Sequence, residues 1–198
     1  MHSYSLDIDI RKGTYILIGA LSLLISSLVI DLGDYFGIQD KIKFSISFGV
    51  AYGVLYWLLN SYLWKLKWLS PIIKIPDLNG NWDTKGISSY KDPKTGKPIE
   101  YDMVIKIKQT FSRIEVFAET ETSTSKSFMA RIEVEHAVPM FIYAFDNTPK
   151  NTANEELQRH PGLVSLRIEE RDKMSGDYFS GKHRLRFGEM TLIRKGNR

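Results

Sequence analysis

Two long uncharged apolar segments occupy most of the first third of the chain. Residues 14–30 and 44–64 contain no Asp, Glu, Lys, Arg or His. At ~1.5 Å per residue, helices of these lengths span ~26 and ~32 Å, about the thickness of a bilayer's hydrocarbon core. Apolar positions lie on all sides of both helices, which favours burial in lipid over packing on one face. The pattern predicts two N-terminal transmembrane α-helices, which form a hairpin within residues 14–68.

Two other interpretations of these segments are a secretory signal peptide and a buried helix pair of a soluble bundle. The first segment is longer than the apolar core of a usual signal peptide, and Asp31 follows it directly, without a small-residue cleavage site. The second segment begins only 13 residues after the first one ends. Both observations favour the membrane hairpin.

The charges that flank the hairpin predict its orientation. The loop between the segments mixes Lys with Asp, whereas the outer flanks are basic. The flanking basic residues are Arg11, Lys12, Lys65, Lys67 and Lys74. Because basic flanks stay on the cytoplasmic side, we expect a multi-pass protein with both termini in the cytoplasm, residues 1–13 included.

The second apolar segment also contains a small-residue motif. Gly49 and Gly53 are four residues apart, and such a pair allows close approach of another helix. The motif predicts self-association of the helices, with packing inside the hairpin as an equally open interpretation.

After a short connector at 69–76, bracketed by Pro71 and Pro76, the pattern changes to a period of two. About eight short strands alternate with turn signals, and no strong helix interrupts them. The expected strands are 81–90, 101–109, 113–120, 127–135, 139–146, 163–171, 175–180 and 183–194. Residues 77–198 are therefore predicted to be an all-β cytoplasmic domain, an antiparallel up-and-down β-barrel, with a sandwich as the alternative.

The alternation also places polar residues inside this barrel. Gln109 shares the parity of Ile105 and Ile107, and Thr120 continues that of Val116, so both are expected to point inward. A hydroxyl-rich stretch follows at 122–125. A barrel of this size can enclose one small ligand, so these positions are candidates for ligand contact, although capping of turns is an equally open explanation.

Composition narrows the chemistry. The chain has no cysteine, which excludes disulfides, thiol nucleophiles and Cys-ligated zinc. Of the net charge of +4, the first 74 residues and the remainder contribute equally, so the β domain is nearly neutral and no DNA or RNA polymer is expected as a partner. The four histidines are scattered and no hydrolase, phosphate-loop or kinase motif is present. The sequence therefore favours a binding domain over an enzyme or a metal site.

Several short motifs, in this order, resemble one known family. They occur at 76–82 (PDLNGNW), 107–109 (IKQ), 120–127, 143–149 (YAFDNTP), 160–162 (HPG) and 175–179 (SGDYF). Together with the two apolar segments, they resemble the two-transmembrane β-barrel effectors of cyclic-oligonucleotide-based antiphage signalling, which are encoded beside a nucleotidyltransferase called a CD-NTase. The resemblance covers nearly the whole chain.

The resemblance implies a function. The barrel of such an effector binds a cyclic dinucleotide made by the partner CD-NTase, the proteins oligomerise in the inner membrane, and the membrane is disrupted so that the infected cell dies. The implied partners are this regulatory ligand, membrane lipids and further copies of the chain, and no other cofactor is expected. Two rival hypotheses are a membrane-anchored carrier or scaffold for a lipid-like molecule and a membrane enzyme that uses His160 or His183.

Particular residue types fit such a ligand. Hydroxyl and amide side chains can bond to base edges, cations can pair with phosphate, and aromatic rings can stack on a base. Trp82 and Arg186 are further candidates, but Trp82 is expected in the barrel core. The candidate ligand contacts are Gln109, Thr120, Thr122, Ser125, Lys126, Tyr143, Asn147, Tyr178 and Arg184.

Overall fold

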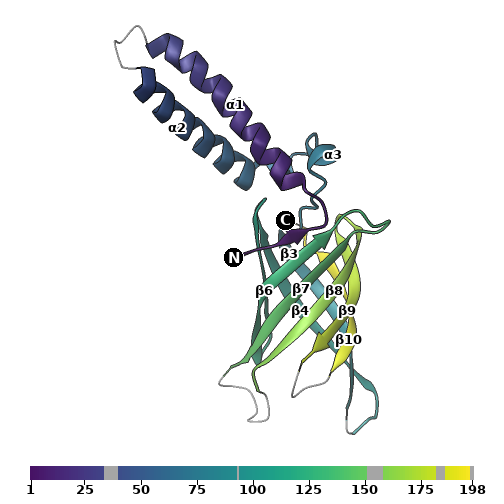
Figure 1. Cartoon of the computed structure of the whole chain (residues 1–198). Coiled ribbons are helices and arrows are strands. Elements are labelled where there is room, and N and C mark those ends of the chain that lie inside the picture. Colours follow the sequence, from purple (N-terminus) through teal and green to yellow (C-terminus); the bar gives the residue numbers. More distant parts are fainter. Residues whose placement is uncertain (34–39, 93, 151–157, 182–185, 197–198) are drawn as a thin grey trace. The chain divides into compact units, whose positions relative to one another are not determined.

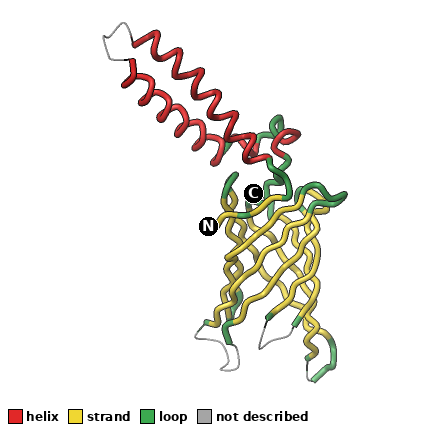
Figure 2. Tube along the Cα trace, viewed as in Figure 1, coloured by secondary structure: helices red, strands yellow, loops and turns green. Residues whose placement is uncertain are grey.

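The computed structural model describes residues 1–33, 40–92, 94–150, 158–181 and 186–196. These residues form two compact units, one made of Met1–Ile8 with Ile75–Arg198 and one made of Asp9–Lys74. Helices are confined to the second unit and strands to the first (Figure 2). The segregation matches the change of sequence period near residue 76.

The helical unit contains two long helices. They are α1 (Ile10–Gly33) and α2 (Asp40–Ser61), followed by the short helices η2 (Leu63–Lys65) and α3 (Ser70–Ile73). Only α1, over Ile10–Val29, is long and apolar enough to count as a membrane span in the described part of the chain. The structure therefore shows one of the two expected spans. The second helix begins at Asp40, four residues before the expected apolar segment.

The surface of α1 is largely apolar and open. Leu24 and Leu28 keep more than 60% of their surface exposed within the chain, whereas Ser22 and Ser26 are fully buried. These two hydroxyl groups donate to the carbonyl oxygens of Ile18 and Ser22, each at 2.7 Å. Because each hydroxyl group forms a hydrogen bond within its own helix, burying the two serines leaves no unpaired polar group. Neither serine needs a ligand.

The β unit is a closed eight-stranded barrel (Figure 1). Each strand pairs antiparallel with its neighbour in the chain, and the last strand returns to the first, where Met190 lies opposite Gly86. This is the predicted up-and-down barrel, and the sandwich alternative is wrong. The strands are β3 (Gly80–Lys91), β4 (Pro98–Gln109), β5 (Arg113–Glu119), β6 (Ser123–Glu133), β7 (Met140–Pro149), β8 (His160–Glu170), β9 (Lys173–Ser180) and β10 (Phe187–Arg194).

Side chains of alternating residues fill the barrel at one end, which we call the plugged end. Trp82 has no exposed surface, as expected of a core residue, and its indole N–H donates to the Leu78 carbonyl at 3.0 Å. The other fully buried large side chains here include Phe111, Ile114, Ile132, Phe141, Leu166, Met174 and Leu192. The opposite, open end holds the β3–β4, β5–β6, β7–β8 and β9–β10 connections.

Several strand boundaries differ from the sequence prediction by three or four residues, and the start of β6 is one of them. β6 begins at Ser123, four residues before the expected start, because the hydroxyl-rich stretch is extended chain and not a turn. Ser123, Ser125 and Ser127 alternate inward until a bulge between Ser127 and Met129 changes the register. The inward-facing side chains of β6 are therefore polar near the start of the strand and apolar near its end.

Residues 1–13, for which the sequence predicts only a cytoplasmic location, contain two short strands before α1. β1 (His2–Ser3) pairs antiparallel with β5, and β2 (Ser5–Leu6) pairs parallel with β6. Strands of two residues have no period, so the sequence pattern does not indicate them.

Gln109 lies at the plugged end of the barrel. Its carboxamide oxygen accepts from the Leu78 N–H at 2.8 Å, and its Nε2 donates to the Pro76 carbonyl at 3.2 Å and toward the Tyr4 hydroxyl at 3.4 Å. The side chain is buried and points inward, as expected, and these hydrogen bonds join it to other parts of the protein. It joins the segment before α1 to the segment that follows the helical unit.

We expect Gln109→Leu to destabilise the barrel by ~1–3 kcal/mol, because the buried N–H of Leu78 loses its acceptor. The free energy of unfolding of the full chain in detergent measures this. The control is Lys108→Leu, since Lys108 is exposed on the outer face of the same strand. Equal stability of the two variants would show that the hydrogen bonds of Gln109 do not stabilise the barrel.

Candidate functional site

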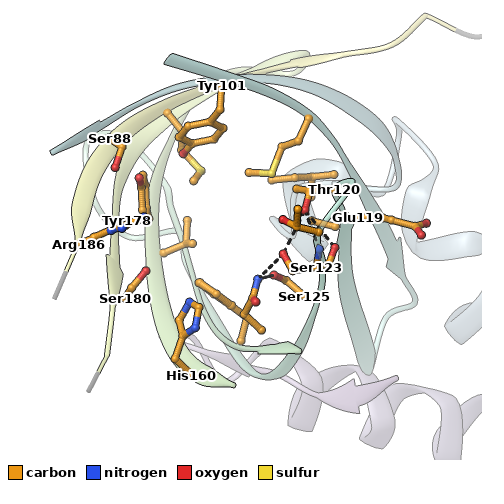
Figure 3. Close-up of a pocket in the computed structure, with 18 of the residues that line it drawn as sticks. Ser88, Tyr101, Glu119, Thr120, Ser123, Ser125, His160, Tyr178, Ser180 and Arg186 are labelled. Atoms are coloured by element: carbon orange, nitrogen blue, oxygen red, sulfur yellow. Dashed lines mark hydrogen bonds between the residues drawn. The ribbon is translucent and has the colours of Figure 1, made fainter. Parts of the chain in front are cut away.

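The open end of the barrel encloses a cavity of about 740 Å³. Figure 3 shows side chains from most of the strands pointing toward it, among them Ser88, Tyr101, Ser125, His160 and Tyr178. The volume lies within the range of ~300–1,000 Å³ that is typical of small-molecule sites. The cavity has an aromatic wall and a polar wall.

The aromatic wall depends on glycines in the facing strands. Tyr101 lies opposite Gly86, Tyr178 opposite Gly188, and Phe145 opposite Gly162. A Cβ atom at Gly86 would lie 2.2 Å from Cζ of Tyr101, and one at Gly162 would lie 2.3 Å from Cζ of Phe145. Each ring therefore occupies the space that a side chain on the neighbouring strand would fill. Because the rings lie over glycine, the centre of the barrel stays open.

Tyr101 and Tyr143, which both line the cavity, remain neutral phenols. Burial, the neighbouring phenol of Tyr178 and a hydrogen bond with it hold the pKa of Tyr101 above its ordinary value. Burial alone raises the pKa of Tyr143. The rings of Tyr101 and Tyr178 meet edge to face, with centroids 5.9 Å apart. Neutral phenol groups combine a face for stacking with a hydroxyl for hydrogen bonding.

The polar wall is built by β5, β6 and β7. Asn147 donates from Nδ2 to the hydroxyl groups of Ser123 at 3.0 Å and Ser125 at 2.9 Å (Figure 3). The Thr120 hydroxyl lies 3.1 Å from that of Ser123. Asn147 Oδ1 is buried and has no hydrogen-bond partner. Because an unpaired buried acceptor is costly, this oxygen offers a ligand a favourable hydrogen bond.

His160 also lines the cavity. The side chain is only 3% exposed, and its Nδ1 lies 2.9 Å from the Gln158 carbonyl. A carbonyl oxygen only accepts, so Nδ1 carries a proton and donates this hydrogen bond.

Arg186 supplies a cation at the cavity margin. Its guanidinium lies 3.9 Å from the centre of the Tyr90 ring, and both side chains line the cavity. Such stacking leaves the guanidinium edge free for an anion. On the opposite rim, Lys150 pairs with Glu119 at 2.6 Å, which reduces the negative charge there.

The structure brings together six of the nine side chains expected from the sequence to contact ligand. Thr120, Thr122, Ser125, Tyr143, Asn147 and Tyr178 line the cavity. Two others do not join them, and the ninth cannot be compared. Gln109 is at the plugged end, Lys126 projects outward in an ion pair of 2.8 Å with Glu115, and Arg184 lies outside the described residues.

Sequence reasoning overlooked the roles of Tyr101 and Gly86 in this site. Tyr101 had the correct inward parity, but its contribution depends on a glycine 15 residues earlier, which only the strand register identifies. His160 was noted only as part of a motif and as a rival enzyme's base. No group of three or more His, Asp or Glu residues within the described ranges is arranged to hold a metal ion.

Comparison with known proteins gives two matches. A family model described as "Cap15, cyclic dinucleotide receptor domain" matches residues 73–194. CD-NTase-associated protein 15 of Yersinia aleksiciae is 29% identical over 134 residues, which cover 67% of this chain and 62% of that protein. The matched family is one of receptor domains, in agreement with the expectation of a binding domain. The barrel and its ligand-sized cavity fall within the matched region. The chain belongs to the Cap15 cyclic dinucleotide receptor family.

Proposed function

We propose that the barrel cavity binds a cyclic dinucleotide and that binding switches on a membrane-disrupting effector in antiphage defence. The observation that carries this proposal is the cavity of about 740 Å³, with its aromatic wall opposite a polar wall, inside a domain of this receptor family. Both kinds of wall match the chemistry of a nucleotide, which has flat bases and polar edges.

Each part of such a ligand has a counterpart in the cavity. Tyr101, Tyr143 and Tyr178 offer aromatic surface, and stacking of one base on an aromatic side chain contributes ~1–3 kcal/mol. Asn147 Oδ1 is an acceptor for the N–H groups of base edges. Arg186 is positioned to pair with phosphate.

The lipid-carrier hypothesis fits this cavity less well. A lipid chain requires an apolar lumen, whereas one wall consists of Thr120, Ser123, Ser125 and Asn147. Covering the unpaired Asn147 oxygen with hydrocarbon costs free energy and gives no hydrogen bond in return.

The path of the chain supports a second membrane crossing. Residues 1–8 and 75–198 belong to the same compact unit, while α1 lies between them in the sequence. A chain that leaves this unit, crosses the bilayer in α1 and rejoins the unit has to cross an even number of times. The basic flanks place this unit on the cytoplasmic side of the inner membrane. We therefore propose α2 as the returning span.

The same helix carries the proposed surface for self-association. A Cβ atom at Gly49 or Gly53 would meet no atom of the described residues within 4 Å, so among these residues neither glycine is a packing contact of α2. Val50, Val54 and Trp57 lie on the same side of the helix and are at least half exposed. The glycine pair is therefore free to contact another copy, and we propose that ligand-driven assembly through it disrupts the inner membrane and kills the infected cell.

The test is calorimetry of the full chain in detergent against a panel of cyclic dinucleotides that differ in base and linkage. We expect saturable binding of at least one member. Heat with none of them would contradict the proposed ligand class. Heat only with a free fatty acid would favour the carrier hypothesis.

We expect Asn147→Leu to weaken binding of that ligand by at least ~10-fold, because the substitution removes both the free acceptor and the anchor of two hydroxyl groups. The same titration measures the dissociation constant. Thr148→Val is the matched control, since Thr148 is exposed and follows Asn147 on the outer face of β7. An unchanged affinity in Asn147→Leu would remove Asn147 from the site.

A further inference from the structure

The weakest pairing in the barrel lies between β5 and β6. These strands pair only from Phe117 opposite Lys126 to Glu119 opposite Thr124, near the open end. Toward the plugged end, β1 pairs with β5 at Ile114, and β2 pairs with β6 at Ile132. Residues 1–8 thus occupy the seam where β5 and β6 separate.

Polar contacts hold this segment in the seam. The Tyr4 side chain is only 3% exposed, and its hydroxyl donates to the Phe111 carbonyl at 3.0 Å. The Asp7 carboxylate accepts from the backbone N–H groups of Val134 and Glu135, each at 2.9 Å. Desolvation opposes ionisation, but these N–H groups hold the pKa of Asp7 below its ordinary value, so the carboxylate is charged at neutral pH.

A short path connects the seam to the cavity. His2 Nε2 lies 2.8 Å from the Ser127 hydroxyl, which also accepts from the Val116 N–H at 2.8 Å. Val116 and Ser125 both line the cavity. Thr120, Ser123 and Ser125, on the same hairpin, form part of its polar wall. One hairpin therefore contacts the cavity at one end and residues 1–8 at the other.

The chain leads directly from this segment into the first helix. α1 begins at Ile10, three residues after Asp7. We propose that residues 1–8 form a clasp that closes the β5–β6 seam and conveys occupancy of the cavity to α1. The inference rests on the proposed function. A ligand bonded to both strands of the hairpin fixes their spacing, and this spacing decides how firmly the clasp is held.

Coupling of this kind is reciprocal, so the ligand must strengthen the clasp if the clasp strengthens ligand binding. In the wild-type chain we expect the cyclic dinucleotide with the highest affinity in the panel to slow hydrogen exchange at the Val134 and Glu135 amides by at least ~10-fold. Equal exchange with and without bound ligand would overturn the coupling.

The decisive variant is Asp7→Asn in the full chain. Reciprocity requires its ligand affinity to fall as well, by at most the factor by which the ligand slows exchange at the two amides. At saturating ligand we expect its assembly, measured by light scattering in lipid nanodiscs or detergent, to fall by more than ~10-fold. Asp9→Asn is the matched control, because it removes the same charge two residues later, where the side chain is exposed. His2→Ala removes the ring contacts with Ser127 and with the Ser3 carbonyl and leaves Asp7 in place. We expect it to lower assembly as well, and we expect this variant to fold even if Asp7→Asn does not.

The outcomes separate the two proposals. A wild-type chain that binds no cyclic dinucleotide refutes the proposed function and the coupling with it. A wild-type chain that binds and assembles beside an Asp7→Asn chain that assembles equally well refutes the clasp alone. Assembly of the Asp7→Asn chain that returns to the wild-type level at saturating ligand shows that residues 1–8 affect only the affinity, which also refutes the clasp.

Discussion

Gly86→Ala is expected to lower affinity for a cyclic dinucleotide by at least ~100-fold, about 2.7 kcal/mol, while the barrel remains folded. The added Cβ would lie 2.2 Å from Cζ and 2.4 Å from the hydroxyl oxygen of Tyr101. Only side-chain atoms clash, so the ring moves and the backbone stays. The alanine methyl group then occupies the space beside the barrel wall, and the Tyr101 ring turns into the cavity.

Calorimetry measures the affinity, and thermal unfolding monitored by circular dichroism reports whether the barrel is intact. Gly196→Ala is the control, because a Cβ there would meet nothing within 4 Å. If Gly86→Ala binds ligand like the wild-type chain, the cavity is not the binding site. A second variant, Tyr101→Leu combined with Gly86→Ala, should recover part of the affinity by removing the displaced ring.

Gly49→Leu is expected to abolish ligand-induced assembly and cell killing while the affinity for ligand stays within about twofold of wild type. A leucine at this open position holds a neighbouring helix away from the α2 backbone, and close approach is what the glycine pair permits. Because residue 49 belongs to the helical unit and the cavity to the other, binding is expected to be unaffected. Assembly of purified protein and survival of induced cells provide the measurements.

The matched control for this variant is Gly19→Leu. It places the same side chain at a glycine of α1 that also has no atom within 4 Å. If Gly49→Leu kills as efficiently as the wild-type chain, the motif has no role in assembly. If both variants are inactive, the effect belongs to the hairpin in general and not to the glycine pair.

The barrel was predictable because nearly every strand has one face inside. Alternation in 101–109 and 113–120 gave these strands to within a few residues, since a slip by one residue would expose every apolar side chain. The start of β6 was missed because Ser123 and Ser125 face a polar cavity, where an inward serine resembles a turn. The clasp was missed because its strands are held by tertiary contacts of Tyr4 and Asp7, which leave no periodic pattern.

The candidate site was predictable only in part, for a physical reason. Parity indicates which face of a strand a residue occupies, but not how far along the barrel it lies. Gln109 and Thr120 both point inward, yet one ties the plugged end together and the other lines the cavity. Tyr101 depends on Gly86, and such a pair becomes visible only when the register of two strands is known.

Closure of the barrel by β10 has a consequence for newly made protein. This strand is the last of the eight, and it pairs with both β9 and β3, so the earlier strands form an open sheet with two free edges until it is added. Met190, which β10 contributes, lines the cavity. Under the proposed function, a nascent chain that ends before residue 194 therefore lacks the strand that closes the cavity, and we expect it not to bind the cyclic dinucleotide.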